Sequence, residues 1–212
     1  MTDTNVNWRY SGRTDGFFGT GATSAERLLA AGAAGVFTIL LILTLRWQGY
    51  EAAQGWRFWV LLALVFDVAG GVTANMLNSC KRYYHAPVQQ NEHGFAAFSK
   101  NSFGFALIHI HPIIAAWAFG GESLHGLVWY GALLVGTGLT LVTPLYLRRP
   151  VAASIVIAAI IVNLYWLPLA PGMEWFIPCL FLKIVLAHTV REEPYRPAAI
   201  KVSSKLGTEG AL

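Results

Sequence analysis

Ionisable side chains lie inside several apolar stretches of this sequence. Asp67 occurs in "VFDVAG", His109 and His111 occur in "LIHIHPII", and Lys183 occurs in "FLKIVLAH". A charged side chain at the centre of a bilayer is costly, so such residues normally face the protein interior and pair with one another. Carboxylate, imidazole and amine groups brought together can bind a cation, carry a proton, or serve as acid and base beside a substrate.

Asp67 and Lys183 are expected to form an ion pair. Asp67 is the only carboxylate deep within an apolar stretch, and Lys183 is the only lysine or arginine equally deep. Each lies roughly ten residues from the outer start of its predicted helix, which places both at a depth of about 15 Å. The pair has two interpretations: a site of chemistry, or a clasp that only fixes how two helices pack.

Small and polar residues share one face of the predicted helix that carries Asp67. At about 100° per residue, Asp67, Gly71, Ala74, Asn75 and Asn78 fall on one stripe of this helix. Small residues permit close helix contact, and asparagines can bond between helices, so packing alone is one explanation. The number of polar side chains on one stripe favours the other explanation, a cavity along this face.

His109 and His111 are weak candidates for metal binding. On a regular helix their side chains would point about 200° apart, but Pro112 disfavours regular helix here, and a kink can bring the rings together. A zinc site needs three or four ligands, and the most plausible additions are Asp67, His85 and His188. Two histidines from different helices, His109 and His188, could also ligate a haem b. No strong motif requires either cofactor.

The segment "NSCKRYYHAP" follows the Asp67 helix at its cytoplasmic end. Lys81 and Arg82 would attract anionic headgroups, and the tyrosines suit the membrane interface. An ordinary basic and aromatic anchor is one interpretation. The other is a cavity mouth for an anionic or amphiphilic substrate, formed by Lys81, Arg82, Tyr84 and His85. The loop of about 86–101 that follows could cover it.

These residues belong to a chain that is 55% hydrophobic and only 12% charged, over 212 residues. Apolar runs of roughly 20 residues match the length of a membrane-spanning helix. The predicted fold is all-α: a polytopic membrane protein with a bundle of six transmembrane helices, in a membrane domain at 25–190. A polar segment at 1–24 precedes this domain, and a polar, flexible tail at 191–212 follows it. The spans are predicted at about 25–45, 57–79, 102–119, 126–147, 151–168 and 173–190.

Basic residues lie mostly on one side of this topology. With six spans, both termini share a side with the residues Arg9, Arg13, Arg27, Lys81, Arg82, Lys100, Arg148, Arg149, Arg191, Arg196, Lys201 and Lys205. The opposite side has only Arg46 and Arg57. This asymmetry predicts cytoplasmic termini in a cell (inner) membrane. It also accounts for the net charge of +4 without a nucleic-acid partner.

Three classes of function fit these features. The leading hypothesis is a polar intramembrane cavity centred on Asp67, His109 and Lys183 that binds or transports a small polar or amphiphilic solute, with proton coupling through Asp67 and a histidine. The second is a membrane-embedded enzyme, metal-dependent or not, acting on a lipid. The third is a non-catalytic assembly subunit of a membrane complex. Membrane lipids are partners in all three.

Overall fold

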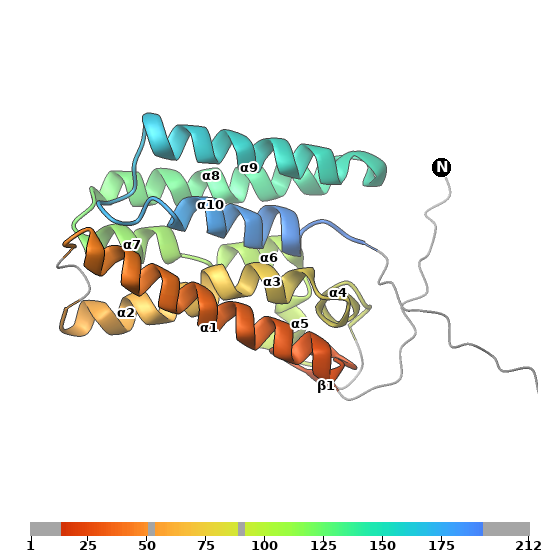
Figure 1. Cartoon of the computed structure of the whole chain (residues 1–212). Coiled ribbons are helices and arrows are strands. Elements are labelled where there is room, and N and C mark those ends of the chain that lie inside the picture. Colours follow the sequence, from red (N-terminus) through yellow and green to blue (C-terminus); the bar gives the residue numbers. More distant parts are fainter. Residues whose placement is uncertain (1–13, 51–53, 89–91, 193–212) are drawn as a thin grey trace, which may run out of the picture.

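Helices make up nearly all of the regular structure in the computed structural model, which describes residues 14–50, 54–88 and 92–192 (Figure 1). The chain is therefore mostly helical, as predicted. In the described ranges, the strands are limited to β1 (Thr14–Asp15) and β2 (Gly19–Thr20), which pair antiparallel. Most of the polar segment at 1–24 and of the tail at 191–212 lies outside the described residues.

Five apolar helices in the described ranges are long enough to cross a membrane. They are α1 (Ser24–Trp47); α2, η2 and α3 together (Trp56–Leu64, Val65–Ala69, Gly70–Met76); α6 and α7 together (Ser102–Leu107, His111–Phe119); α8 (Ser123–Val142); and η3 with α9 (Leu145–Leu147, Arg148–Tyr165). A further apolar helix, α10 with η4 (Phe176–Phe181, Leu182–His188), is shorter. All of them run back and forth along one bundle (Figure 1).

Local signals set several of the helix ends. Thr23 and Glu26 form the expected capping box at the start of α1, in which each side chain accepts a hydrogen bond from the other's backbone amide. Pro150 lies in the first turn of α9, where a missing amide proton costs nothing. The second predicted span, 57–79, is too long at its C-terminal end, because the extended backbone of Leu77 (ψ 143°) ends the helix at Met76.

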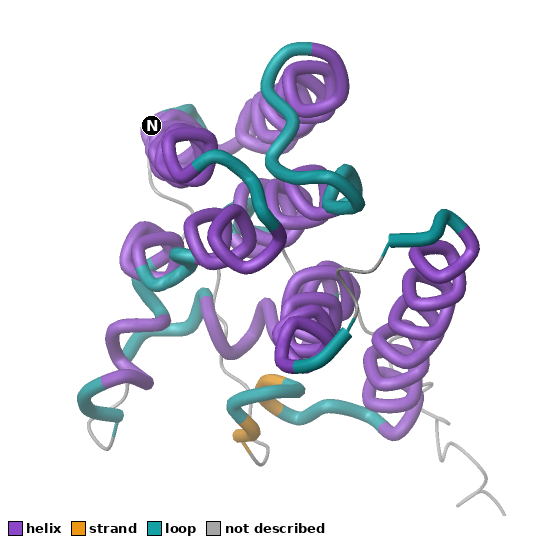
Figure 2. Tube along the Cα trace, turned by 90° about the vertical axis from the view of Figure 1, so that its left-hand side faces the viewer, coloured by secondary structure: helices purple, strands orange, loops and turns teal. Residues whose placement is uncertain are grey.

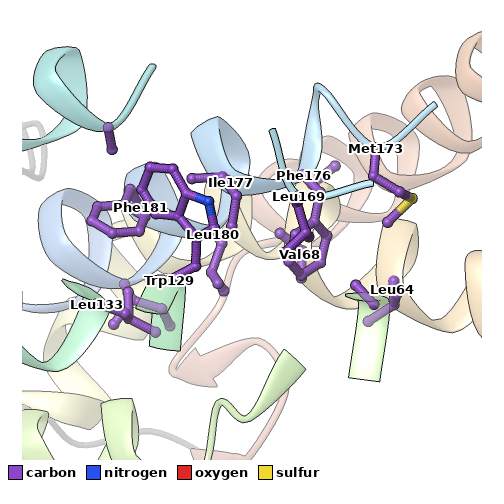
Figure 3. Close-up of a cluster of buried hydrophobic side chains, with 14 of the residues drawn as sticks. Leu64, Val68, Trp129, Leu133, Leu169, Met173, Phe176, Ile177, Leu180 and Phe181 are labelled. Atoms are coloured by element: carbon purple, nitrogen blue, oxygen red, sulfur yellow. The ribbon is translucent and has the colours of Figure 1, made fainter. Parts of the chain in front are cut away.

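The shortest apolar helix lies at the centre of the bundle. α10 and η4 contact α3, α8 and α9. Figure 2 looks along the bundle, so that most helices are seen nearly end-on. The side chains of Phe176, Ile177, Leu180 and Phe181 are almost fully buried and form the apolar core with residues such as Trp129 (Figure 3). Many residues on the outer helix faces are apolar and exposed, as expected for surfaces in contact with lipid.

The N-terminal hairpin (β1 and β2) and the short helix α4 (Asn78–Tyr84) dock on each other at one end of the bundle. In Figure 1, α4 is seen end-on, turned away from the direction of α3. Gly19 has a positive φ of 80°, and a Cβ atom there would lie 2.2 Å from the carbonyl oxygen of Ser79. The backbone of Phe17 accepts a hydrogen bond from the buried thiol of Cys80 at 3.7 Å.

Replacing Gly19 with Ala should separate the hairpin from α4. Burial, with a further contribution from the charge of Glu26, raises the pKa of the Cys80 thiol to about 12. Exposure should lower this pKa and speed alkylation, since the thiolate is the nucleophile. In a Cys179→Ser background at pH 8, we expect Gly19→Ala to increase the rate of Cys80 alkylation at least tenfold.

The matched control is Gly16→Ala, because a Cβ atom at Gly16 meets nothing within 4 Å. It should leave the alkylation rate unchanged. Equal rates in Gly19→Ala and the wild-type protein would show that the hairpin does not protect Cys80.

Candidate functional site

Asp67 and Lys183 form the predicted ion pair. The Nζ atom of Lys183 donates a hydrogen bond to Oδ2 of Asp67 at 2.6 Å. The Lys183 side chain is 4% exposed, whereas the Asp67 side chain is 47% exposed and faces a cavity. The aliphatic part of Lys183 crosses Gly71, where a Cβ atom would lie 2.6 Å from its Cε atom. The small residue at position 71 therefore leaves room for the lysine to reach Asp67.

His109 is the second partner of Lys183. Its Nδ1 atom lies 2.6 Å from the carbonyl oxygen of Phe105, and its Nε2 atom lies 3.1 Å from Nζ of Lys183. A carbonyl oxygen can only accept, so Nδ1 carries the proton and Nε2 presents a lone pair to the site. The Lys183 ammonium thus donates both to a carboxylate and to an imidazole.

His111 completes a compact group around Asp67. Its Nε2 atom lies 3.4 Å from Oδ2 of Asp67, and the rings of His109 and His111 are 5.0 Å apart between centroids. One ligand atom from each of Asp67, His109 and His111 lies within 4.8 Å of the others, a grouping that can hold a metal ion. The two histidines that a regular helix would separate are therefore brought together, as the kink hypothesis predicted.

Each of these residues lies where its helix is irregular. Asp67 lies in the π-helical η2, and Lys183 lies in the π-helical η4. His109 lies in the break between α6 and α7, after which Pro112 occupies the first turn of α7. The carbonyl of Leu107, left without a helical partner by this break, accepts a hydrogen bond from the hydroxyl of Tyr130 at 2.7 Å. The backbone carbonyl that this break leaves free within the helix is therefore satisfied by a side chain of another helix.

A cavity of about 270 Å³ opens over these side chains. Its polar wall consists of Asp67, Asn75, His109, His111 and Lys183. The rest of the wall is mainly apolar and aromatic, and is formed by Gly16, Phe17, Phe66, Gly71, Ala74, Tyr84, Phe95, Phe105 and Ile108. Asp67, His109 and Lys183, which were predicted to lie at the centre of a cavity, all line this one, and its other walls are largely aromatic and apolar.

The asparagine stripe is only partly as predicted. Asn75 lines the cavity and is 7% exposed, with its Nδ2 atom lacking a hydrogen-bond partner among the described residues. Asn78 lies beyond the extended Leu77, at the start of α4, and is absent from the described cavity wall. The stripe required a continuous helix to residue 78, and the chain turns before that point.

The prediction of a basic cavity mouth is wrong for Lys81 and Arg82, which are 3% and 5% exposed. Lys81 donates hydrogen bonds to the carbonyl oxygens of Ala187 and Val190, at the end of η4. Arg82 donates to the carbonyl oxygens of Thr20 and Gly21, and lies 3.8 Å from Glu26. Both cations therefore hold other parts of the chain against α4, because unsatisfied carbonyls at chain turns are their nearest acceptors.

Tyr84 is the predicted mouth residue that does lie on the cavity wall. Burial raises the pKa of its phenol above the usual range. Burial, assisted by the charge of Lys81, lowers the pKa of His85 to about 3, so His85 is neutral at physiological pH.

His188 lies outside the group of possible metal ligands formed by Asp67, His109 and His111. Its ring is 1% exposed and stacks on Phe105, with ring centroids 3.8 Å apart. Because Phe105 also packs against His109 at 4.5 Å, a haem b between the two histidines would require Phe105 to move.

Sequence reasoning missed the aromatic wall. Phe17 comes from the N-terminal hairpin and stacks on Phe66, with ring centroids 5.6 Å apart. Phe95 comes from α5 (Phe95–Ser99), in the loop that was expected to cover the cavity. An exposed phenylalanine in a polar segment, such as "DGFFG" at 15–19, was the available signal.

Comparisons of this chain with protein-family models, with curated proteins and with solved structures give no match. The function is therefore argued from the geometry of the site.

Removing the carboxylate of Asp67 should lower the free energy of unfolding more than removing the ammonium of Lys183. Asp67→Asn leaves a buried ammonium without its carboxylate, a change that typically costs about 3–5 kcal/mol. Lys183→Met leaves a half-exposed carboxylate and should cost clearly less. The double variant should resemble Lys183→Met in thermal melting followed by circular dichroism in one detergent.

Glu122→Gln is the matched control, because this carboxylate is 76% exposed and lies beside His125. It should melt like the wild-type protein. Equal losses from the two single changes at Asp67 and Lys183, or a double variant as unstable as their sum, would contradict the asymmetry.

Lys81 should make stability depend on pH. Burial lowers the pKa of Lys81 from the ordinary value of 10.5 to about 8. The unfolded chain therefore binds more protons between these values, so stability should rise with pH across this window, by up to about 3 kcal/mol. Lys81→Met and Lys81→Arg should both lose this rise in melting experiments, since arginine stays charged. Parallel pH profiles for all three proteins would show that Lys81 does not titrate there.

Proposed function

We propose that this chain is a six-span inner-membrane protein that binds a small polar or amphiphilic solute in the cavity at Asp67 and transports it. The observation that carries the proposal is the coincidence of ionisable residues with helix interruptions. Asp67, His109 and Lys183 lie in three different helices, each near its middle and each where the helix is irregular. Irregular backbone at membrane depth is tolerated where it lines a cavity, and transporters place binding sites at such points.

Three features are consistent with six spans whose termini lie on one side of the membrane, the side that the basic residues identify as cytoplasmic. The first is the segment that would form the sixth span. The helix α10 with η4 is about 20 Å long, and the non-helical stretch of 166–175 precedes it and extends the segment. α1 begins and η4 ends at the same end of the bundle (Figure 1). The other end carries the exposed tryptophans Trp47, Trp56, Trp59, Trp117 and Trp166, as a membrane interface does.

The cavity wall supports an amphiphilic ligand in particular. Phe66, Asp67 and Ile108 line it; Phe66 and Ile108 are exposed, and the Asp67 side chain is 47% exposed. An opening bordered by apolar residues suits a molecule that enters from the lipid and places its polar end near Asp67. The buried Nδ2 atom of Asn75 offers a further donor to that polar end.

A membrane-embedded enzyme acting on a lipid is the second candidate. It is favoured by the group formed by Asp67, His109 and His111, because two imidazoles and a carboxylate beside a cavity can hold a catalytic metal. An assembly subunit, in which the pair only fixes packing, is the remaining alternative.

The proposal predicts a bound molecule that depends on the polar wall. The wild-type protein, released from the membrane with its native lipid into nanodiscs, should carry a defined small molecule in native mass spectrometry. We expect the double variant Asp67→Asn, Lys183→Met to lose at least nine-tenths of it while remaining folded, because the charged groups that contact its polar end are removed.

Glu122→Gln is again the control and should retain the molecule. If wild type and double variant carry the same molecules in the same amounts, the polar cavity has no specific ligand and the Asp67–Lys183 pair is a packing clasp. Conversion of an added lipid by the wild-type protein would instead favour the enzyme.

A further inference from the structure

We infer that Asp67, His109 and His111 form a binding site for one divalent transition-metal ion, with Zn²⁺ as the best-suited example, and that the ammonium group of Lys183 competes with the metal for this position. This inference goes beyond the proposed function, because a metal site is compatible both with a transporter and with a membrane-embedded enzyme.

The separations between ligand atoms fit such an ion. Two ligands at about 2.0–2.1 Å from a tetrahedral zinc lie about 3.3 Å apart. Oδ2 of Asp67 and Nε2 of His111 are 3.4 Å apart, and the ligand atoms of all three residues lie within 4.8 Å of one another. All three ligand atoms therefore lie within about 1.5 Å of the separation that a tetrahedral zinc requires.

His109 is also oriented for metal binding. The hydrogen bond from Nδ1 of His109 to the carbonyl oxygen of Phe105 leaves Nε2 as the ligand atom. A metal-binding imidazole is commonly oriented by such a hydrogen bond from the ring nitrogen that does not bind the metal. Imidazole nitrogens favour zinc and its neighbours over magnesium or calcium, which prefer oxygen ligands.

Lys183 places a positive charge among these ligand atoms. Its Nζ atom lies 2.6 Å from Oδ2 of Asp67 and 3.1 Å from Nε2 of His109, so it contacts two of the three proposed ligands. A metal ion and an ammonium cannot share this position. The lysine stem crosses Gly71 and has four flexible carbons, which allows the ammonium to withdraw.

Three protein ligands leave one coordination position for a ligand from the cavity. Such an open position is typical of zinc sites that bind or activate a second molecule, whereas structural zinc sites usually have four protein ligands. Asp67, His109 and His111 all line the cavity, so the open position would face it. A polar group of a solute or a water molecule can complete the coordination.

The test is titration of the full-length protein in detergent, after dialysis against a chelator, with Zn²⁺ by calorimetry and with Co²⁺ by visible absorption. The wild-type protein should bind one Zn²⁺ per chain, and Lys183→Met should bind at least tenfold more tightly. In the Lys183→Met background, His111→Ala and His109→Ala should each weaken binding at least tenfold, and Co²⁺ should show the intense bands of a tetrahedral site.

His188→Ala in the same background is the matched control, because this buried histidine lies outside the group. It should leave the affinity unchanged, and melting curves establish that each variant is folded. If Lys183→Met does not fold, Lys183→Gln serves in its place, since it also removes the charge.

Several outcomes would overturn the inference. These are no saturable Zn²⁺ binding by the wild-type protein, an affinity that Lys183→Met leaves unchanged, or binding that survives both His109→Ala and His111→Ala. If the cavity molecule is found by mass spectrometry but none of the proteins binds metal, solute binding stands and only the metal site fails.

Discussion

The fold depends on placing a lysine in the centre of an apolar helical bundle and giving it partners there. Lys183 is almost fully buried and has Asp67 and His109 as hydrogen-bond partners. A buried ammonium without such partners would cost far more than one well-packed apolar residue contributes. Three separate helices must therefore present the right atoms at one depth. The irregularities of η2, of η4 and of the break before α7 accompany this convergence.

Much of this arrangement could be predicted from the sequence. Apolar runs located the helices with boundary errors of up to six residues. Depth alone matched Asp67 with Lys183, because both are exceptions within otherwise apolar helices. Pro112 also indicated the break that brings His109 and His111 together. These predictions share one property: each depends on local sequence and on the fixed rise of a helix.

The rest depended on tertiary contacts that no local pattern contains. The position of Leu77 in an extended conformation removed Asn78 from the cavity. Lys81 and Arg82 have the composition of a membrane-surface anchor, yet their acceptors are carbonyls at 187 and 190 and at 20 and 21, distant in sequence. Phe17 and Phe95 reach the cavity from segments outside the long helices. Side chains of the same type can face solvent or carbonyls, and only the packing decides which.

The short central helix has a consequence for how the protein is made. α10 contains 6 residues, and η4, which carries Lys183, contains 7. An apolar segment this short that also carries a lysine gains little from partitioning into lipid by itself. The earlier helices, which supply Asp67, His109 and the buried faces around it, come first in the chain. In the proposed six-span arrangement, the last helix is thus expected to enter the membrane through association with its neighbours, so that insertion of this helix and formation of the site are one event.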